Sequence, residues 1–384
     1  MSSGKIISNP DLTVGADNKQ RWNQPAHRRH GFHNAHRLFR RGLMVRSKEV
    51  LVLGSAEQDL CAAVPGLADL ISHPAFSAFC CLKGDQIIME KAAEDFSTLA
   101  PHSIQSVSKL HIHLIIGRLL AEGRVALEGR VRDYLPDMGS GYADATVQAL
   151  LDMDVENDFT EDYADPQADC YAEEIALGWR LPRAGAADVS LAEFASAITG
   201  FRVRAGAEGG AGQVTYKSAN TDVLTLIAAE VSPVPLAAHI EAIADAAGYE
   251  GAWHISMSKD GHPAFSGGGC LSARDLARFG MLLARGGQDL HGQSMANRAF
   301  LEETRTRPAH SMSPPKDWLR YSNHTMTDGR MLGHAGYGGQ FLMVDMASGT
   351  SCAFLSVLEN EAGYDDAYMG QLSEVLRDVC LSVS

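Results

Sequence analysis

A serine and a lysine three residues apart, Ser106 and Lys109, are the residues whose types and spacing most directly suggest covalent chemistry. On a helix, side chains at positions i and i+3 lie on one face, so the lysine amine can reach the serine hydroxyl. An amine accepts a proton only in its neutral form, which the apolar residues around Lys109 would favour by excluding water. The pair therefore predicts a nucleophile, Ser106, with Lys109 as its base.

The surrounding sequence separates this pair from others with the same spacing. Only Ser106 begins a long run of apolar residues at a helical period, which continues to Glu122 and ends at Gly123. The free amides at the start of such a helix can stabilise an oxyanion. An ordinary amphipathic helix with an exposed lysine would fit this motif alone equally well. The other pairs with this spacing are Ser2/Lys5, Ser256/Lys259 and Ser313/Lys316.

Two later segments contain groups that could complete such a site. Tyr216 comes shortly before a helix expected over residues 223–231, and its phenol could pass a proton between a serine and a leaving group. A glycine-rich run over residues 333–340 leads into a strand, and its glycines would let a ligand approach the backbone closely. Taken singly, a core or surface tyrosine and a plain hairpin turn explain these segments without any chemistry.

Periodicity and turn signals predict the elements that must position these residues. We expect an α/β fold in which an antiparallel sheet, built from both chain ends and flanked by helices, is interrupted by a mid-chain, mostly helical insert. The predicted parts are an N-terminal arm over 1–50, an α/β sheet domain over 51–128 and 270–384, and a mainly helical domain over 129–269. The individual elements expected are a hairpin over 75–92, strands over 340–345 and 351–357, and helices over 106–122, 271–285 and 361–381.

Composition limits the partners and the compartment. The 384 residues are 45% hydrophobic, which is enough for a large core. A formal charge of −14 disfavours nucleic acid and anionic membranes as partners. No apolar signal segment and no run of roughly 20 apolar residues is evident, so we expect a cytoplasmic protein. The basic stretch over 27–41 could be a patch for an anion or nucleic acid, but a solvated arm packed on the body is favoured because the whole chain is acidic.

Seven cysteines, an odd number without C-x-x-C or Cys/His ligand spacing, predict neither a disulfide framework nor a metal site. Buried reduced thiols are the expected state. No cofactor is indicated by any motif.

The order of the three motifs resembles that of the serine β-lactamase and penicillin-binding superfamily. Within it, the chain is most similar to the class C β-lactamases and to the nylon-oligomer (6-aminohexanoate-dimer) hydrolases with their esterase relatives. The segments that carry the resemblance are Ser106-Val107-Ser108-Lys109, Leu120-Ala121-Glu122-Gly123-Arg124, Glu161-Asp162-Tyr163-Ala164-Asp165-Pro166, Gly178-Trp179-Arg180, Ser218-Ala219-Asn220-Thr221-Asp222 and Ala273-Arg274-Asp275-Leu276.

The resemblance implies a role for each site residue. Ser106 would accept the acyl group, Lys109 would be its base, and Tyr216 would deliver the proton to the leaving group. The backbone N–H groups of Ser106 and Tyr337 would form the oxyanion hole. Where β-lactamases have Lys-Thr-Gly this chain has His334-Ala335-Gly336, which argues against β-lactam hydrolysis.

The resemblance also implies a substrate pocket. Glu174 would keep the negative charge that binds a substrate amine in the nylon-oligomer hydrolases, which favours an amide or ester near an amino group. A solvated helix face explains Glu173-Glu174 equally well. The expected substrate contacts are Tyr163, Glu174, Trp179, Ser266 and His334.

Together these inferences predict a cofactor-free serine hydrolase that cleaves an amide of a small, amino-bearing substrate through an acyl-serine intermediate. The alternatives are a carboxylesterase using the same residues, acyl transfer to an amine, and a binding module with a disabled site. The expected partner is a small-molecule amide or ester, and the sequence leaves a homodimer open.

Overall fold

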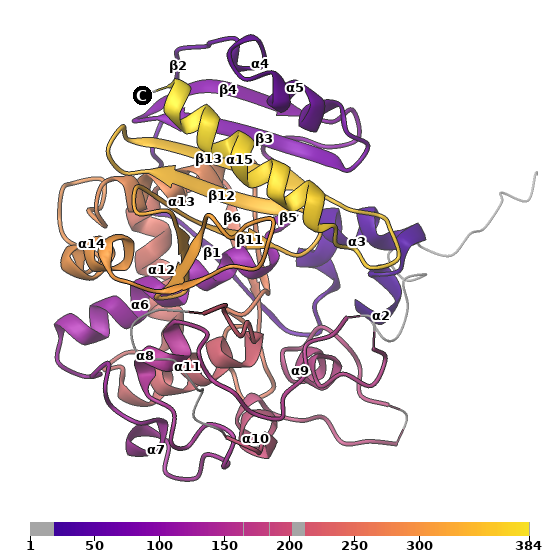
Figure 1. The fold of residues 1–384 in the computed structure, drawn as a ribbon, viewed down its shortest axis with the longest axis vertical. Helices are drawn as coiled ribbons and strands as arrows, with labels where there is room; N and C mark the ends of the chain where they lie inside the picture. The colour runs from indigo at the N-terminus through magenta and orange to yellow at the C-terminus, as the bar shows by residue number, and fades with distance from the viewer. Residues whose placement is uncertain (1–18, 164, 184, 202–211, 384) are drawn as a thin grey trace, which may run out of the picture.

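A nine-stranded sheet forms the centre of the computed structural model, which describes residues 19–163, 165–183, 185–201 and 212–383 (Figure 1). Neighbouring strands are antiparallel except for the short parallel pair β2 and β4. In spatial order the strands are β2 (Gly54–Ser55), β4 (Gln86–Ala92), β3 (Phe76–Lys83), β13 (Thr350–Ser356), β12 (Gln340–Asp345), β11 (Met331–Gly336), β10 (Thr325–Thr327), β9 (Arg320–Ser322) and β8 (His310–Ser311). The predicted α/β fold, with a sheet drawn from both chain ends, is confirmed.

Helices cover both faces of this sheet, which explains why its central strands are apolar throughout. Along β3, Phe79 and Cys81 pack in one core cluster with residues of the C-terminal helix α15 (Asp366–Ser382). Cys80, on the opposite face, belongs to a second cluster with residues of α13 (Ala273–Ala284). Because successive side chains of a strand alternate between faces, each helix buries one face of the sheet. Figure 1 shows α15 in front of the sheet and α13 behind it.

A mostly helical region lies below the large sheet in Figure 1, and a small second sheet overlaps the lower strands of the large sheet in this view. The four-stranded sheet has the order β1 (Gly42–Arg46), β6 (Ala252–Ser256), β7 (Gly269–Leu271), β5 (His102–Ser103). The helices of this region are α6 (Lys109–Ala121), α7 (Val131–Tyr134), α8 (Val147–Leu151), α9 (Cys170–Ala176), α10 (Leu191–Ala197), α11 (Ser218–Val231) and α12 (Leu236–Ala247). The remaining helices are α4 (Leu60–Ala63) and α5 (Pro65–Ser72) beside α15, and α14 (Arg298–Thr306).

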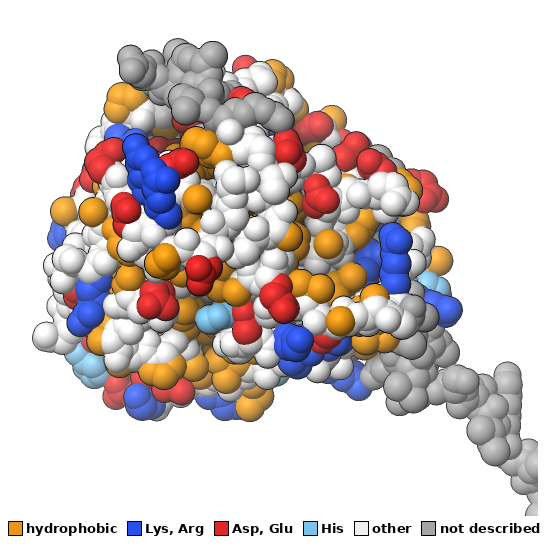
Figure 2. All heavy atoms as spheres, turned by 90° about the horizontal axis from the view of Figure 1, so that it is seen from below, with side chains coloured by type: hydrophobic (Ala, Val, Ile, Leu, Met, Phe, Trp, Pro, Cys, Tyr) orange, Lys and Arg blue, Asp and Glu red, His pale blue; other side chains and the backbone are white. Residues whose placement is uncertain are grey.

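From residue 19 onward the N-terminal arm packs on the body. Its helices are α2 (Lys19–Trp22) and α3 (Pro25–Leu38), followed by β1. Arg28, 2% exposed, donates to the backbone oxygen of Leu358 at 2.8 Å and to that of Asn23. Part of the basic stretch therefore bonds to the protein itself. Seen from below, acidic and basic side chains are interspersed over the described surface (Figure 2).

The observed elements agree closely with the predicted strands and differ at helix starts. The hairpin is β3 and β4, and the two C-terminal strands are β12 and β13. The last helix begins at Asp366 rather than at residue 361, because Asp365 accepts a hydrogen bond from the amide of Tyr368 and caps it. Among the described residues no single helix could span a membrane by length and apolar content; the bent pair α11 and α12 meets that test only when combined.

Candidate active site

Ser106 lies in a strained turn that leads into α6. It belongs to a short 3-10 helix, η1 (Gln105–Ser108), and the α-helix starts only at Lys109. The preceding Gln105 has φ of +47°, a conformation that costs a residue with a side chain about 1 kcal/mol or more. Its side chain donates to Ser103 Oγ at 2.6 Å. The turn leaves Ser106 half-buried, with its side chain at a pocket.

Lys109 is fully buried and has three oxygen partners. Its Nζ lies 3.0 Å from Ser106 Oγ, 3.1 Å from Ser218 Oγ and 2.6 Å from the backbone oxygen of Ser266. Burial lowers the pKa of Lys109, against the opposing effect of nearby acids led by Glu161. The donor and acceptor roles of these three partners suit a neutral amine.

A neutral lysine amine has two N–H groups and one lone pair. The carbonyl oxygen of Ser266 can only accept, so it takes one N–H. Ser218 Oγ gives its own proton to Glu161 at 2.7 Å, so it accepts the second. The lone pair then remains for the hydroxyl proton of Ser106, which is the proton a base must remove.

Glu161 connects this network to the loop that precedes α9. One carboxylate oxygen accepts the backbone N–H of Ser218 at 2.5 Å, at the N-terminus of α11 where negative charge is favoured. The other accepts from Ser218 Oγ and from the hydroxyl of Tyr163 at 2.8 Å. Glu161 therefore fixes both the orientation of Ser218 and the position of Tyr163.

Tyr216 completes the cluster from the segment before α11. Lys109 Nζ lies 5.1 Å from the centre of its ring, and its hydroxyl is near enough to Ser106 for that side chain to affect the pKa of the phenol. Burial, reinforced by the negative charge of Glu161, raises the pKa of Tyr216 well above its usual value. The phenol therefore keeps its proton and is a proton donor beside Ser106.

A pair of buried carboxyl groups lies on the other side of the lysine. Glu173 and Asp222 interact with each other, and burial raises the pKa of Asp222 to about 6 and that of Glu173 well above its usual value. Two carboxylates in contact disfavour double ionisation, so the pair holds a proton near neutral pH.

The glycine-rich segment passes directly behind the nucleophile. A Cβ added to Gly336, at the end of β11, would lie 2.6 Å from the backbone oxygen of Ile104, so only glycine permits this approach. Tyr337 follows at once and lines the same pocket as Ser106. The segment therefore brings Tyr337 to the pocket that Ser106 lines, and its backbone N–H as part of an oxyanion hole stays a prediction.

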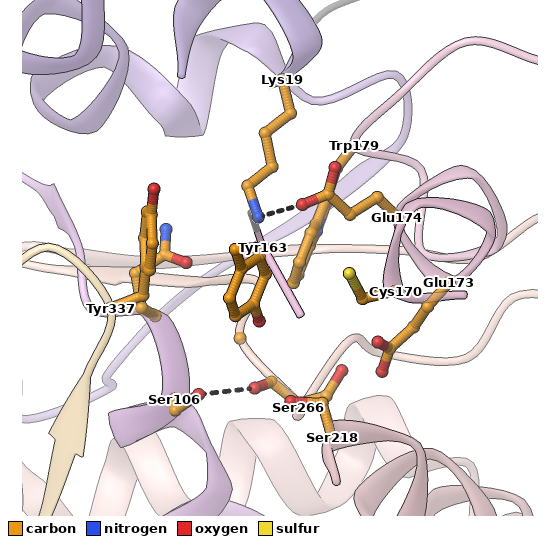
Figure 3. Close-up of a pocket in the computed structure, with 12 residues that line it drawn as sticks. Lys19, Ser106, Tyr163, Cys170, Glu173, Glu174, Trp179, Ser218, Ser266 and Tyr337 are labelled. Atoms are coloured by element: carbon orange, nitrogen blue, oxygen red, sulfur yellow. Dashed lines mark hydrogen bonds and ion pairs between the residues drawn. The ribbon is translucent and has the colours of Figure 1, made fainter. Parts of the chain in front are cut away.

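Ser106 opens into a pocket with about 320 Å³ of empty space when its open mouth is included (Figure 3), while Lys109 and Tyr216 lie outside its lining. In Figure 3, Ser106 and Ser218 lie at its lower end, Tyr337 on one side, and Trp179 and Glu174 on the other. The lining residues are Lys19, Gln105, Ser106, Tyr163, Cys170, Glu173, Glu174, Trp179, Ser218, Ser266, Gly267 and Tyr337. Of the five expected substrate contacts, all but His334 are among them.

His334 is fully buried behind Tyr216. Its Nε2 bonds to the hydroxyl of Tyr321 at 3.0 Å, and its Nδ1 to the backbone oxygen of Ala335 at 2.6 Å. Burial lowers its pKa well below the usual value, so the ring is neutral. His334 therefore lies against Tyr216 and Tyr321 rather than in the pocket lining.

The acidic pocket residue Glu174 is already paired. One of its oxygens lies 2.5 Å from Lys19 Nζ, and the other accepts from Arg180 at 2.9 and 3.0 Å. The side chain is only 3% exposed. The charge that was expected to attract a substrate amine is therefore balanced by the protein itself.

The competing serine–lysine pairs have structural partners. Ser256 Oγ accepts from the indole N–H of Trp179 at 2.5 Å, while Lys259 donates to the backbone oxygen of Asp188. Lys316 donates to Tyr364 at 2.6 Å. Ser2 and Lys5 lie outside the described residues.

The sequence interpretation gave no role to Lys19, Glu161, Glu173 or Asp222, which the structure brings to the site. Glu161 and Asp222 stood inside segments singled out for their resemblance, so their positions were a usable signal. Lys19 had none, because only the folded chain brings the N-terminal arm to Glu174.

Comparison with known proteins identifies the family of this chain. A sequence profile of the Beta-lactamase family matches residues 63–372, which is most of the chain. The chain belongs to the beta-lactamase family. Members share the fold described above, which confirms the predicted superfamily, and the chain is a serine hydrolase of that family.

The similar proteins of this family include amide and ester hydrolases. The chain is 30% identical to 6-aminohexanoate-dimer hydrolase of Paenarthrobacter ureafaciens over 294 residues, covering 72% of this chain and 70% of that protein. A structure from Bacillus anthracis, provisionally assigned as a 6-aminohexanoate-dimer hydrolase, has a TM-score of 0.78 at 20% identity and covers 99% of both chains. A family VIII carboxylesterase has a TM-score of 0.58 at 16% identity, over 84% of this chain and 98% of its own. At such identities the two structures show the shared fold alone.

Proposed function

We propose that this hydrolase cleaves an amide of a small substrate in two steps, through an acyl group carried on Ser106. The observation that carries the proposal is the buried Lys109 amine 3.0 Å from the Oγ of Ser106, which lines a pocket. The 30% identity to an enzyme named for hydrolysing an amide dimer supports the amide as substrate class.

In the first step Ser106 Oγ attacks the carbonyl carbon while its proton passes to Lys109. The negative charge on the carbonyl oxygen would be held by the backbone N–H groups of Ser106 and Tyr337. The C–N bond then breaks, and the amine leaves with a proton supplied through Tyr216, which Lys109 replenishes. The products of this step are a free amine and an ester on Ser106.

In the second step water attacks this ester, giving its proton to the same Lys109 and Tyr216 pair. Ser106 leaves as a hydroxyl, and the carboxylic acid is released. The site returns to its starting protonation, so no cofactor is consumed. The buried carboxyl pair Glu173 and Asp222 would keep the lysine in place without adding a full second negative charge.

The expectation of an amino-bearing substrate depended on a free carboxylate at Glu174. Because Lys19 and Arg180 occupy both of its oxygens, Glu174 offers no free charge to a substrate amine. We therefore propose the amidase reaction without a requirement for an amino group.

Matched substrates test the proposal against its alternatives. A p-nitroanilide and the p-nitrophenyl ester of the same acid give the amide and ester rates, and an added amine that is converted to a new amide would reveal acyl transfer. We expect measurable anilide turnover that is abolished in Ser106→Ala. Ester turnover with no anilide turnover would favour a carboxylesterase, and a fluorophosphonate probe that fails to label Ser106 would indicate a disabled site.

A further inference from the structure

Lys19 is a charged pocket residue that the proposed mechanism does not use. Its side chain is 4% exposed but lines the same pocket as Ser106. The ammonium nitrogen lies 4.5 Å from the centre of the Trp179 ring and 5.9 Å from that of Tyr337. In Figure 3 it points into the pocket from the N-terminal arm, toward Glu174.

The structure holds this lysine firmly. Its backbone N–H donates to the carbonyl oxygen of Trp179 at 2.9 Å. Trp22, at the other end of α2, is 2% exposed and meets the ring of Phe32 edge-on at 6.0 Å. A Cβ on Gly31 would lie only 2.4 Å from the Trp22 ring, so the arm and α3 are closely fitted. Lys19 is therefore a fixed part of the pocket wall.

Lys19, Glu174 and Arg180 form a group with a net positive charge. Glu174 is a single carboxylate between two cations, Lys19 on one oxygen and Arg180 on the other. Glu161 is engaged by Ser218 and Tyr163, away from the lysine. One positive charge is thus left on this group, of which Lys19 and Glu174 line the pocket, and low exposure weakens its screening by water. Glu173, the other acid of the lining, has a pKa raised well above its usual value by burial.

Lysine also retains hydrogen-bonding capacity here. An ammonium group has three N–H donors, and Glu174 takes one of them. Its other described neighbours at this distance are the faces of aromatic rings, which attract a cation but accept hydrogen bonds weakly. A carboxylate in the pocket would accept the remaining donors through charge-assisted hydrogen bonds.

We propose that Lys19 is a substrate-binding residue, and that the pocket selects an amide or ester that also carries a carboxylate. This inference rests on the proposed function and specifies its substrate class. It reverses the charge expected from Glu174 alone, because the acid serves to hold the lysine rather than a substrate amine.

Three p-nitrophenyl esters of equal chain length test this inference, one ending in a carboxylate, one in a methyl group and one in an amine. We expect wild-type kcat/KM to be highest for the carboxylate ester and to fall about 10-fold for it in Lys19→Gln, with a smaller change for the methyl ester. Lys19→Arg should restore most of the preference. Lys48→Gln, which removes a lysine with an 83% exposed side chain, is the matched control for net charge.

Two results would overturn the inference. Equal losses for all three esters in Lys19→Gln, with a lower melting temperature, would assign Lys19 a structural role only. A higher kcat/KM for the amine ester in Lys19→Gln would mean that the Lys19 ammonium occupies the position where a substrate amine binds.

Failure of the proposed function gives a different result, because no ester would then be hydrolysed. In that case calorimetry with glutarate, a dicarboxylate that needs no catalysis, decides the inference alone. Weaker glutarate binding to Lys19→Gln than to wild type supports it, and equal or absent binding refutes it.

Discussion

Replacing Lys109 by alanine should remove the base while leaving Ser106 in its turn. The amine has a definite task here: two of its three partners, the Ser266 carbonyl and Ser218 Oγ, use its N–H groups, and the third is the nucleophile. Losing a general base costs on the order of 10²- to 10⁴-fold in rate. At about 1.36 kcal/mol per tenfold, this corresponds to roughly 3 to 5 kcal/mol of transition-state stabilisation.

The assay is the acylation rate with a p-nitrophenyl ester under single-turnover conditions. Lys259→Ala is the matched control, because Lys259 has the same spacing from a serine but lies exposed outside the pocket. We expect it to keep near-wild-type rates. If Lys109→Ala retained more than a tenth of wild-type activity, the assignment of the base would be wrong.

The pKa of Lys109 also determines how kcat/KM depends on pH. Burial lowers the pKa of Lys109, so a larger fraction of the amine is neutral near pH 8 than for a free lysine. The acid limb of kcat/KM should therefore rise with pH through the pKa of this amine. A profile that falls as pH rises through this range would mean that the protonated lysine is the active form.

The remaining predictions concern the groups around this pair. Tyr216→Phe should lower kcat for an anilide by roughly 10² and for an ester by less, because an amine leaving group needs the proton more; equal losses measured for both substrates would contradict its role as donor. Ser218→Ala should lower the acylation rate about 10-fold by releasing one N–H of Lys109, and an unchanged rate would show that the hydroxyl plays no part. Arg28→Met should lower the free energy of unfolding by about 3 kcal/mol in urea titration, since buried carbonyl oxygens such as that of Leu358 lose their donor; a loss below 1 kcal/mol would contradict this.

Local sequence was sufficient for the strands β3, β4, β12 and β13 and for the contact between Ser106 and Lys109. The runs around Phe79 and over residues 340–345 are apolar on both faces, as strands buried between two layers of helices must be. The Ser106 and Lys109 pair was evident because both residues lie within one turn of the chain. The 3-10 geometry of that turn was not predicted, because nothing in the sequence indicates that Gln105 adopts a positive φ.

Contacts between residues far apart in the sequence could not be predicted from local patterns. Glu174 was recognised as an acid near the site, but its neutralisation by Lys19 depends on how the arm folds back across the body. His334 stands in a motif that suggested substrate contact, whereas the side chain of a strand residue faces whichever layer the register dictates. That register turned it toward Tyr321.

The central claim is that Ser106 carries the acyl group. Intact-mass spectrometry of wild type, quenched with acid within the first turnover of an amide substrate, followed by peptide mapping, tests this most directly. The account predicts an added mass equal to the acyl half of the substrate, located on the peptide that contains Ser106 and absent from Ser106→Ala. Turnover of the amide with the added mass on another residue, or equal turnover by Ser106→Ala, would contradict it.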